Sequence, residues 1–400
     1  MSGFSIPGLG LLLLLASVVA MLSRRLRLPY SVALVAAGAA LAFLPASPAL
    51  PLSRDLIFNV FLPPLVFEGA LQLKWNRFRA ELPVTLTLAF LGVPIGAAIV
   101  AAGMHYLIGW SWIGASLFGI LIAATDPVSV IAAFKEMRVQ PRLAMIVESE
   151  SLLNDGAAAV GFVVLAGIAA GASAGAEQVS ATLVWTVLGG LGAGIAVAGA
   201  ALLLAGRTQD HLVEITLTTI AAYASFLLAE RFHASGVLAA LAAGLMVGNV
   251  GWMGSISDSS RPHVLAFWQF AAFLANSLIF LLIGLHGAHQ PIAQFAPAVG
   301  LAIVLVLLAR VAAVYPLAAL FYRSGLRLPA VYQHVLFWGG LRGALALGLA
   351  LALPAGIAER NQIVVVSFAV VAFSVFVQGL TMPPLLRWFG VCVESEEEAE

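Results

Sequence analysis

The sequence predicts an all-α polytopic membrane protein. Hydrophobic residues make up 62% of its 400 residues, charged residues only 10%, and the mean hydropathy is +1.04. A soluble domain carries about 25% charged residues. The 38 glycines and 19 prolines predict breaks inside helices, which a bilayer tolerates only where protein or a cavity satisfies the freed backbone groups. The net charge of zero excludes a strongly basic nucleic-acid binder, and no motif for bases or phosphates appears.

Apolar runs of spanning length predict about 13 transmembrane helices. They lie near residues 8–22, 30–45, 55–72, 81–105, 110–134, 142–171, 180–205, 210–231, 234–250, 263–287, 292–321, 330–353 and 361–387. The runs at 30–45 and 234–250 are short. Arginines follow the first run and no positive charge precedes it, the reverse of a signal peptide, so we expect it to be retained.

Lysine and arginine are distributed unevenly among the predicted loops. With the N-terminus outside, inner loops hold 14 of the 19, outer loops hold Arg54, Arg231 and Arg360, and the last two lie within helices. Because positive residues concentrate on the cytoplasmic side, we expect a multi-pass plasma-membrane protein with its N-terminus outside and its C-terminus in the cytoplasm. A transmembrane domain of residues 1–393 would then end in an acidic cytoplasmic tail of residues 394–400.

Two predicted helices carry polar breaks at corresponding places. Ala123–Val128 interrupts the helix at 110–134, and Phe337–Ala344 interrupts the helix at 330–353. Segments seven apart run in opposite directions, so the first six and last six helices are expected to form inverted repeats, linked by the helix at 180–205. Transporters of this design bind ions where discontinuous helices meet near the midplane. We therefore expect these two discontinuous helices to cross at an ion site.

The sequence Thr125-Asp126-Pro127 predicts a half-helix that begins inside the membrane. Proline fits the first position of a helix, and aspartate is among the best residues to cap it. Carbonyls left free by the preceding half can coordinate a cation. The alternative is a proline kink with a capping Asp126 and no ion, but a second acidic cluster on the next helix favours the ion site.

That cluster, Glu148–Asp155, places three acids in one predicted helix. Ionisable groups at this depth cost roughly 2.5–3.5 kcal/mol each and usually mark an ion or proton path. Ser151 and Asp155 share a helix face. We expect Asp155 to be the binding carboxylate, with Ser151 and Asn154 supplying neutral oxygens for a hard cation such as Na⁺. Glu148, nearer the cytoplasm, is expected to line the entry funnel.

Glu150 needs a partner, because a lone buried carboxylate is costly. Arg310 and Arg342 are the two basic residues within predicted helices. We expect a structural Glu150–Arg310 pair, with Arg342 as the counter-charge to free carbonyls at the break in 330–353; the sequence leaves the exchange of the two arginines open. Pro127 is expected to contribute to the other break.

Glu68 either faces the same cavity or lies near the inner interface and snorkels toward Lys74. The seven histidines show no pairing or ligand spacing, so we expect ordinary interfacial roles for them.

Four motifs together resemble the monovalent cation:proton antiporter family, the NhaP/NHE-type sodium/proton exchangers. They are Phe61–Gly69 (FLPPLVFEG), Ala124–Val128 (ATDPV), Glu148–Gly156 (ESESLLNDG) and Gly339–Ala344 (GGLRGA), in family order over most of the chain. The resemblance implies a homodimer with a moving core, the Glu150–Arg310 brace, and electroneutral exchange because Asn154 precedes Asp155. It also implies a set of ion ligands: Asp155, Asp126, Thr125, Ser151 and Glu68.

The expected function is secondary active exchange of Na⁺, Li⁺ or K⁺ for one H⁺ by alternating access, with cation and proton competing for Asp155 and no cofactor. One alternative is a K⁺-selective antiporter. Another is an intramembrane aspartyl protease, which also needs two carboxylates on neighbouring helices; no glycine-rich approach precedes either carboxylate, and Asp126 is occupied as a cap. The third alternative is an ion channel, but discontinuous helices around a midplane site fit alternating access better.

Overall fold

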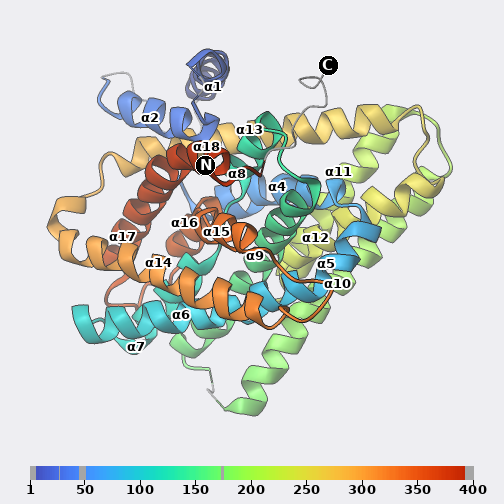
Figure 1. Ribbon diagram of the computed structural model, residues 1–400. Helices are drawn as coiled ribbons and strands as arrows, with labels where there is room; N and C mark the ends of the chain where they lie inside the picture. The colour runs from blue at the N-terminus through green and yellow to red at the C-terminus, as the bar shows by residue number, and fades with distance from the viewer. Residues whose placement is uncertain (1–5, 27, 45–50, 173–174, 392–400) are drawn as a thin grey trace.

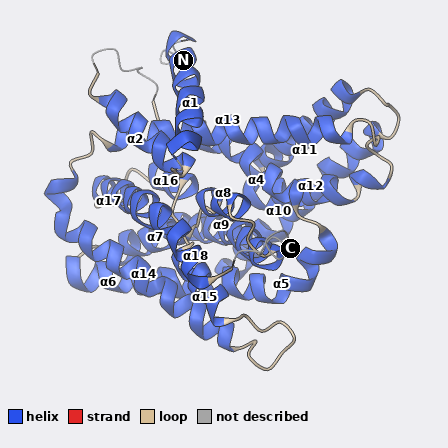
Figure 2. Ribbon diagram, turned by 45° about the horizontal axis from the view of Figure 1, so that its top comes forward, coloured by secondary structure: helices blue, strands red, loops and turns tan. Residues whose placement is uncertain are grey.

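The computed structural model describes residues 6–26, 28–44, 51–172 and 175–391, and every regular element within them is a helix (Figure 2). Cys392 and the acidic run at 394–400 lie outside the described residues. In chain order the helices are α1 (Ile6–Leu26), α2 (Tyr30–Ala42), α3 (Arg54–Leu56), η1 (Ile57–Phe61), α4 (Leu62–Gln72), α5 (Trp75–Phe90), α6 (Gly92–Gly103), η2 (Met104–Ile108), α7 (Trp112–Ala123), α8 (Val128–Glu136), α9 (Pro141–Ala169), α10 (Ala176–Ala205), α11 (His211–Arg231), α12 (Gly236–Asn249), η3 (Gly251–Met253), α13 (Arg261–Gly287), η4 (Ile292–Phe295), α14 (Ala296–Ala319), α15 (Ala330–Trp338), α16 (Ala344–Leu351), α17 (Arg360–Phe373), η5 (Ser374–Gln378) and α18 (Gly379–Phe389).

Nine helical stretches of the described chain are long and apolar enough to cross a membrane. They are Trp75–Ile108, Trp112–Glu136, Pro141–Ala169, Ala176–Ala205, His211–Arg231, Gly236–Met253, Arg261–Gly287, Ile292–Ala319 and Arg360–Phe389. The runs predicted at 8–22, 30–45, 55–72 and 330–353 are helical too, but they are shorter or interrupted. The protein is therefore an all-helical, multi-pass membrane protein.

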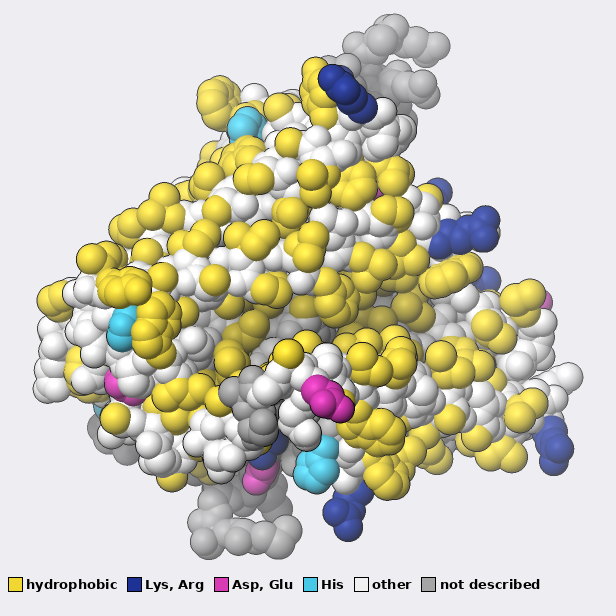
Figure 3. All heavy atoms as spheres, turned by 90° about the horizontal axis from the view of Figure 1, so that it is seen from below, with side chains coloured by type: hydrophobic (Ala, Val, Ile, Leu, Met, Phe, Trp, Pro, Cys, Tyr) yellow, Lys and Arg dark blue, Asp and Glu magenta, His cyan; other side chains and the backbone are white. Residues whose placement is uncertain are grey.

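The outward faces of the long helices are apolar. On α10, Leu188 and Leu203 are 62% and 76% exposed, and Leu308 on α14 is 53% exposed. Figure 3 shows hydrophobic side chains over most of one face of the molecule, with lysine and arginine mainly toward its edges. Monomeric soluble proteins rarely expose apolar patches of this extent, whereas lipid tails are a suitable environment for them.

The two broken helices lie inside this shell. Helices α8, α9, α15 and α16 occupy the centre of the view, between α13 on one side and the neighbouring α6 and α14 on the other (Figure 1). Helix α13 packs closely on α2, since Gly38 faces the carbonyl of Leu281 and Gly284 faces that of Val35. Small residues allow such close helix contact in membranes.

Each break occurs where the sequence places its helix-breaking residues. Helix α7 ends at Ala123 and α8 begins at Val128, one residue later than the predicted start at Pro127. The carboxylate of Asp126 accepts a hydrogen bond from the Val128 amide at 3.0 Å. Helices α15 and α16 are separated by residues 339–343, which include three glycines. Two half-helices in each case therefore present free backbone groups inside the protein.

A carboxylate outside the spanning segments links the starts of α7 and α17. Glu359 accepts hydrogen bonds from the amide of Ser111 at 2.9 Å and from its hydroxyl at 3.0 Å, and Ser111 itself caps α7. Partial burial raises the pKa of Glu359, but the hydrogen bonds from Ser111 and its own amide together hold the pKa below the usual glutamate range. The ionised form of Glu359 thus stabilises the fold.

We expect Glu359→Gln to lower the free energy of unfolding by about 0.5–1 kcal/mol near neutral pH, because the carboxylate is partly exposed. Since the folded pKa is depressed, this contribution is complete above the unfolded pKa and disappears as the pH falls through the folded pKa. Melting temperatures of the wild type and Glu359→Gln should therefore differ at pH 7 and converge only at pH values below the usual glutamate pKa. A difference that grows with acidity would contradict this sign.

Candidate functional site

The two helix breaks meet at Asp126. Its amide donates to the carbonyl of Leu341 at 2.7 Å. Its carboxylate accepts from the amide of Val128, which starts α8, and from the amide of Ala344, which starts α16. One side chain therefore caps two half-helices that are more than 200 residues apart in sequence. The N-terminal ends of both helices stabilise its negative charge.

Gly343 makes this arrangement possible. A β-carbon at position 343 would collide with the carboxylate and the β-carbon of Asp126, which have no room to retreat between the two helix ends. The residue directly before α16 must therefore lack a side chain.

We expect Gly343→Ala to destabilise the protein by about 1–3 kcal/mol and to impair its activity, because overpacking at the meeting point displaces Asp126. Gly192→Ala on α10 is the matched control, since a β-carbon there meets no atom within 4 Å. Thermal unfolding of both variants tests this directly. Equal melting temperatures of Gly343→Ala and Gly192→Ala would contradict the prediction.

Two arginines satisfy the free carbonyls at the breaks. Arg342 donates from Nη1 to the carbonyls of Ala123 and Ala124 at 2.6 and 3.2 Å. Arg310 donates to the carbonyl of Leu336 at 3.2 Å from Nε and 3.0 Å from Nη2. We had expected Arg342 to compensate the free carbonyls at the break in 330–353, but it binds carbonyls at the other break. Because the broken helices meet, Arg342 reaches the carbonyl end of α7, and Arg310 on α14 serves α15.

The structure pairs Glu150 with Arg310. The guanidinium and the carboxylate form two hydrogen bonds, of 2.8 and 3.1 Å, and their side chains are 9% and 3% exposed. Asn154 donates to Glu150 at 3.5 Å. Its oxygen has no hydrogen-bond partner among the described residues. Asn154 thus lies with the ion pair and does not line the cavity that Asp155 faces, in contrast to our expectation that it supplies an oxygen there.

That cavity has a volume of about 590 Å³. Among the predicted site residues, it is lined by Thr125, Asp126, Pro127, Asp155, Glu68 and Glu148. Ser151 lies behind Thr125: its hydroxyl donates to the Thr125 carbonyl at 2.6 Å and accepts from the Thr125 hydroxyl at 3.3 Å. Oδ1 of Asp155 is buried and has no hydrogen-bond partner among the described residues. Asp155 is therefore the acid at this meeting point with free coordination capacity.

Several polar side chains in and near this cavity have positions that the sequence left open or did not indicate. Glu68 faces the cavity and accepts a hydrogen bond from Gln72, and the basic residue beside it in the cavity wall is Lys135, not Lys74. Helix α13 contributes Gln269 and Asn276. Ser374 in η5 holds both backbone groups of Arg342, at 3.0 and 3.1 Å. These are single polar residues in apolar runs, and only their spatial neighbours distinguish them.

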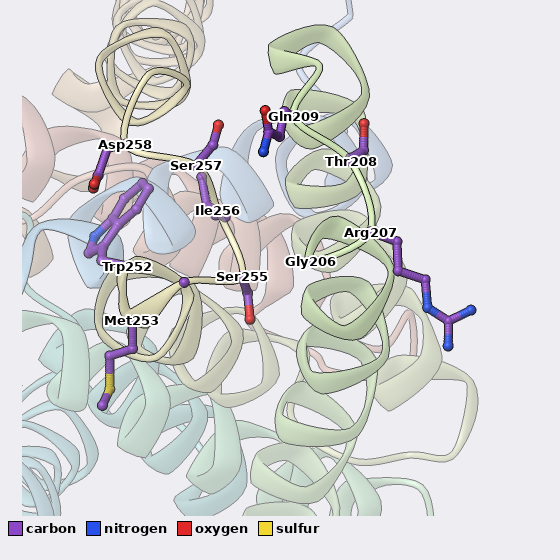
Figure 4. A pocket seen from close by; sticks show the side chains of 11 residues that line it. Gly206, Arg207, Thr208, Gln209, Trp252, Met253, Ser255, Ile256, Ser257 and Asp258 are labelled. Atoms are coloured by element: carbon purple, nitrogen blue, oxygen red, sulfur yellow. The ribbon is translucent and has the colours of Figure 1, made fainter.

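A second cavity, of about 820 Å³, lies elsewhere and contains none of the predicted site residues. It is formed by the α10–α11 and α12–α13 connections and is shown in Figure 4, where Arg207 points away from Trp252. Near it, the exposed rings of His211 and His263 lie 4.7 Å apart. Sequence spacing does not indicate this contact, because the two rings come from α11 and α13, and both rings remain exposed.

Comparison with known proteins gives consistent matches. The family model described as "Sodium/hydrogen exchanger, transmembrane" matches residues 11–388. The low-affinity Na⁺/H⁺ antiporter NhaS1 of Synechocystis sp. is 37% identical over 381 residues, covering 94% of this chain and 72% of that one. The Na⁺/H⁺ antiporter NhaP of Pseudomonas aeruginosa is 34% identical over 358 residues, covering 86% and 84%.

The fold has a solved counterpart. The sodium proton antiporter MjNhaP1 from Methanocaldococcus jannaschii at pH 8 superposes with a TM-score of 0.78 and 21% identity, over 96% of this chain and 98% of that one. At this identity the match establishes the fold alone. The family model, in contrast, spans nearly all of the chain, and several relatives exceed 30% identity over most of their length. The chain belongs to the sodium/hydrogen exchanger family, whose members are transporters and not enzymes.

Proposed function

We propose that this protein exchanges Na⁺, or Li⁺ or K⁺, for H⁺ across the membrane by alternating access, with cation and proton competing for Asp155. The observation that carries the proposal is that Asp155 lines the 590 Å³ cavity together with residues of both helix breaks, and that its Oδ1 has no hydrogen-bond partner among the described residues. The similar proteins NhaS1 and NhaP are named Na⁺/H⁺ antiporters, which supports the same assignment.

The proposed cation ligands are Asp155, Asp126, Thr125, Ser151 and Glu68. Oxygen donors of this kind suit a hard monovalent cation. Asp126 already accepts two amide hydrogen bonds, whereas Oδ1 of Asp155 accepts none from the described residues and is free to bind a proton or a cation. With Asn154 neutral and turned toward Glu150, one carboxylate changes its ligand in each cycle. One cation is then exchanged for one proton, and the exchange is electroneutral.

The proposal includes the wider architecture. Residues 1–393 would form a domain of about 13 transmembrane helices in two inverted six-helix repeats linked by α10, with the discontinuous helices α7–α8 and α15–α16 crossing at the ion site. The N-terminus would lie outside, as the distribution of lysine and arginine favours. Two chains would form a homodimer in the plasma membrane. Cross-linking in native membranes tests the dimer, and labelling of single cysteines in the loops tests the orientation.

The decisive experiment is a pH-dye assay in proteoliposomes with Na⁺, Li⁺, K⁺ and choline added in turn. We expect at least one of Na⁺, Li⁺ and K⁺ to dissipate an imposed pH gradient. Choline should have no effect. Clamping the membrane potential with valinomycin and K⁺ should leave the rate of Na⁺-driven exchange unchanged. A rate that follows the clamp would contradict one-for-one exchange, and no response to any cation would refute antiport.

A response to K⁺ alone would select the K⁺-selective alternative over the Na⁺ exchanger. Membership in a family of transporters leaves no support for the intramembrane protease considered from the sequence.

A further inference from the structure

Three side chains of ionisable residues from three different helices line the 590 Å³ cavity, in addition to Asp126 and Asp155. They are Glu68 on α4, Lys135 on α8 and Glu148 on α9. The two carboxylates repel each other, and the charge of Lys135 attracts both. The cluster therefore combines two acidic side chains with one basic side chain in the wall of the cavity that Asp155 also lines.

Lys135 is exposed and forms no ion pair within 4.0 Å among the described residues. This distinguishes it from Arg310, whose guanidinium is buried in a bidentate pair with Glu150. An ion pair in direct contact largely cancels its own electric field. An ammonium group that is bound to neither carboxylate instead attracts both across the cavity. The field at the cavity wall then depends on the balance of all three charges.

We propose that Lys135 sets the apparent affinity of the transporter for its cation by offsetting the attraction of Glu68 and Glu148 in the cavity. The inference rests on the proposed function, because it concerns the path to Asp155. Two unopposed carboxylates in a low-dielectric cleft would concentrate cations strongly and delay their release. Lys135, as a tethered positive charge, reduces this accumulation without occupying the binding site.

The test is Lys135→Gln, measured at low ionic strength. We expect the apparent KM for Na⁺ to fall roughly three- to tenfold, with little change in the maximal rate, because one positive charge leaves the cavity. The effect should fade when choline chloride raises the ionic strength to about 1 M, where the Debye length is about 3 Å. An ordinary interfacial lysine would leave the KM unchanged at both salt concentrations, and that result would overturn the proposal.

Three variants sharpen the comparison. Lys135→Arg keeps the charge and should retain the wild-type KM. Lys74→Gln removes an exposed lysine that does not line the cavity, and it should also leave the KM unchanged. Glu148→Gln combined with Lys135→Gln restores the net charge and should return the KM close to the wild-type value. A KM that stays low in the double variant would contradict an electrostatic origin.

A binding measurement separates this inference from the proposed function. In detergent, the Na⁺ concentration that gives half of the maximal thermal stabilisation should fall by the same factor in Lys135→Gln. If Lys135→Gln binds Na⁺ more tightly than the wild type but neither protein moves protons, antiport fails while the role of Lys135 stands. If the wild type exchanges ions and Lys135→Gln changes neither KM nor binding, the role of Lys135 fails alone. Absence of stabilisation and exchange in every variant would overturn both.

Discussion

Replacing Asp155 with asparagine is expected to abolish cation-driven proton exchange while the protein still inserts and folds. Asparagine keeps the shape of the side chain but neither binds a proton at working pH nor carries the charge that attracts a cation. Because Oδ1 of Asp155 makes no hydrogen bond within the described residues, an amide nitrogen in its place breaks no hydrogen bond of that atom. The measurement is the Na⁺-driven dissipation of a pH gradient in everted vesicles, which should fall to the level of vesicles without the protein.

Asp258→Asn is the matched control for this experiment. Asp258 is an exposed acid that lines the second cavity, so its replacement should leave exchange unchanged. Retention of exchange in Asp155→Asn at comparable protein levels would refute the assignment of Asp155 as the shared site.

Glu150→Ala is expected to lower the free energy of unfolding by about 3–5 kcal/mol and to affect ion affinity less. Among the described residues, the substitution leaves the buried guanidinium of Arg310 with the Leu336 carbonyl as its one remaining partner, and an uncompensated buried charge is costly. The melting temperature in detergent measures the effect. It should fall further than that of Asp155→Asn, because Asp155 has no comparable partner.

Two comparisons isolate the role of the ion pair. Glu150→Leu combined with Arg310→Met removes both charges, so it should destabilise less than Glu150→Ala alone. Arg54→Ala disrupts a partly exposed contact of 4.0 Å with Glu230 and should cost less than about 1 kcal/mol. A melting shift for Glu150→Ala that is smaller than the shift for Asp155→Asn would contradict the bracing role.

The sequence alone determined the fold class and the positions of both helix breaks. Hydropathy follows local composition, and a membrane admits only helices or closed barrels, so long apolar runs identify the spanning segments. The break at Thr125-Asp126-Pro127 follows from local chemistry too, since proline lacks an amide hydrogen and aspartate caps the next helix. The predicted and observed starts of α8 differ by one residue.

The tertiary structure alone decided which side chains meet. It brings Arg342 to the carbonyl end of α7, turns Asn154 toward Glu150, and places Lys135 in the cavity wall with Glu68 and Glu148. Each of these contacts joins residues through the angle and rotation at which two helices pack, and no local pattern encodes that geometry. Spacing along one helix showed that Asp155 and Ser151 share a face. It did not show that Asp126 would cap two half-helices at once, because the second helix begins more than 200 residues later.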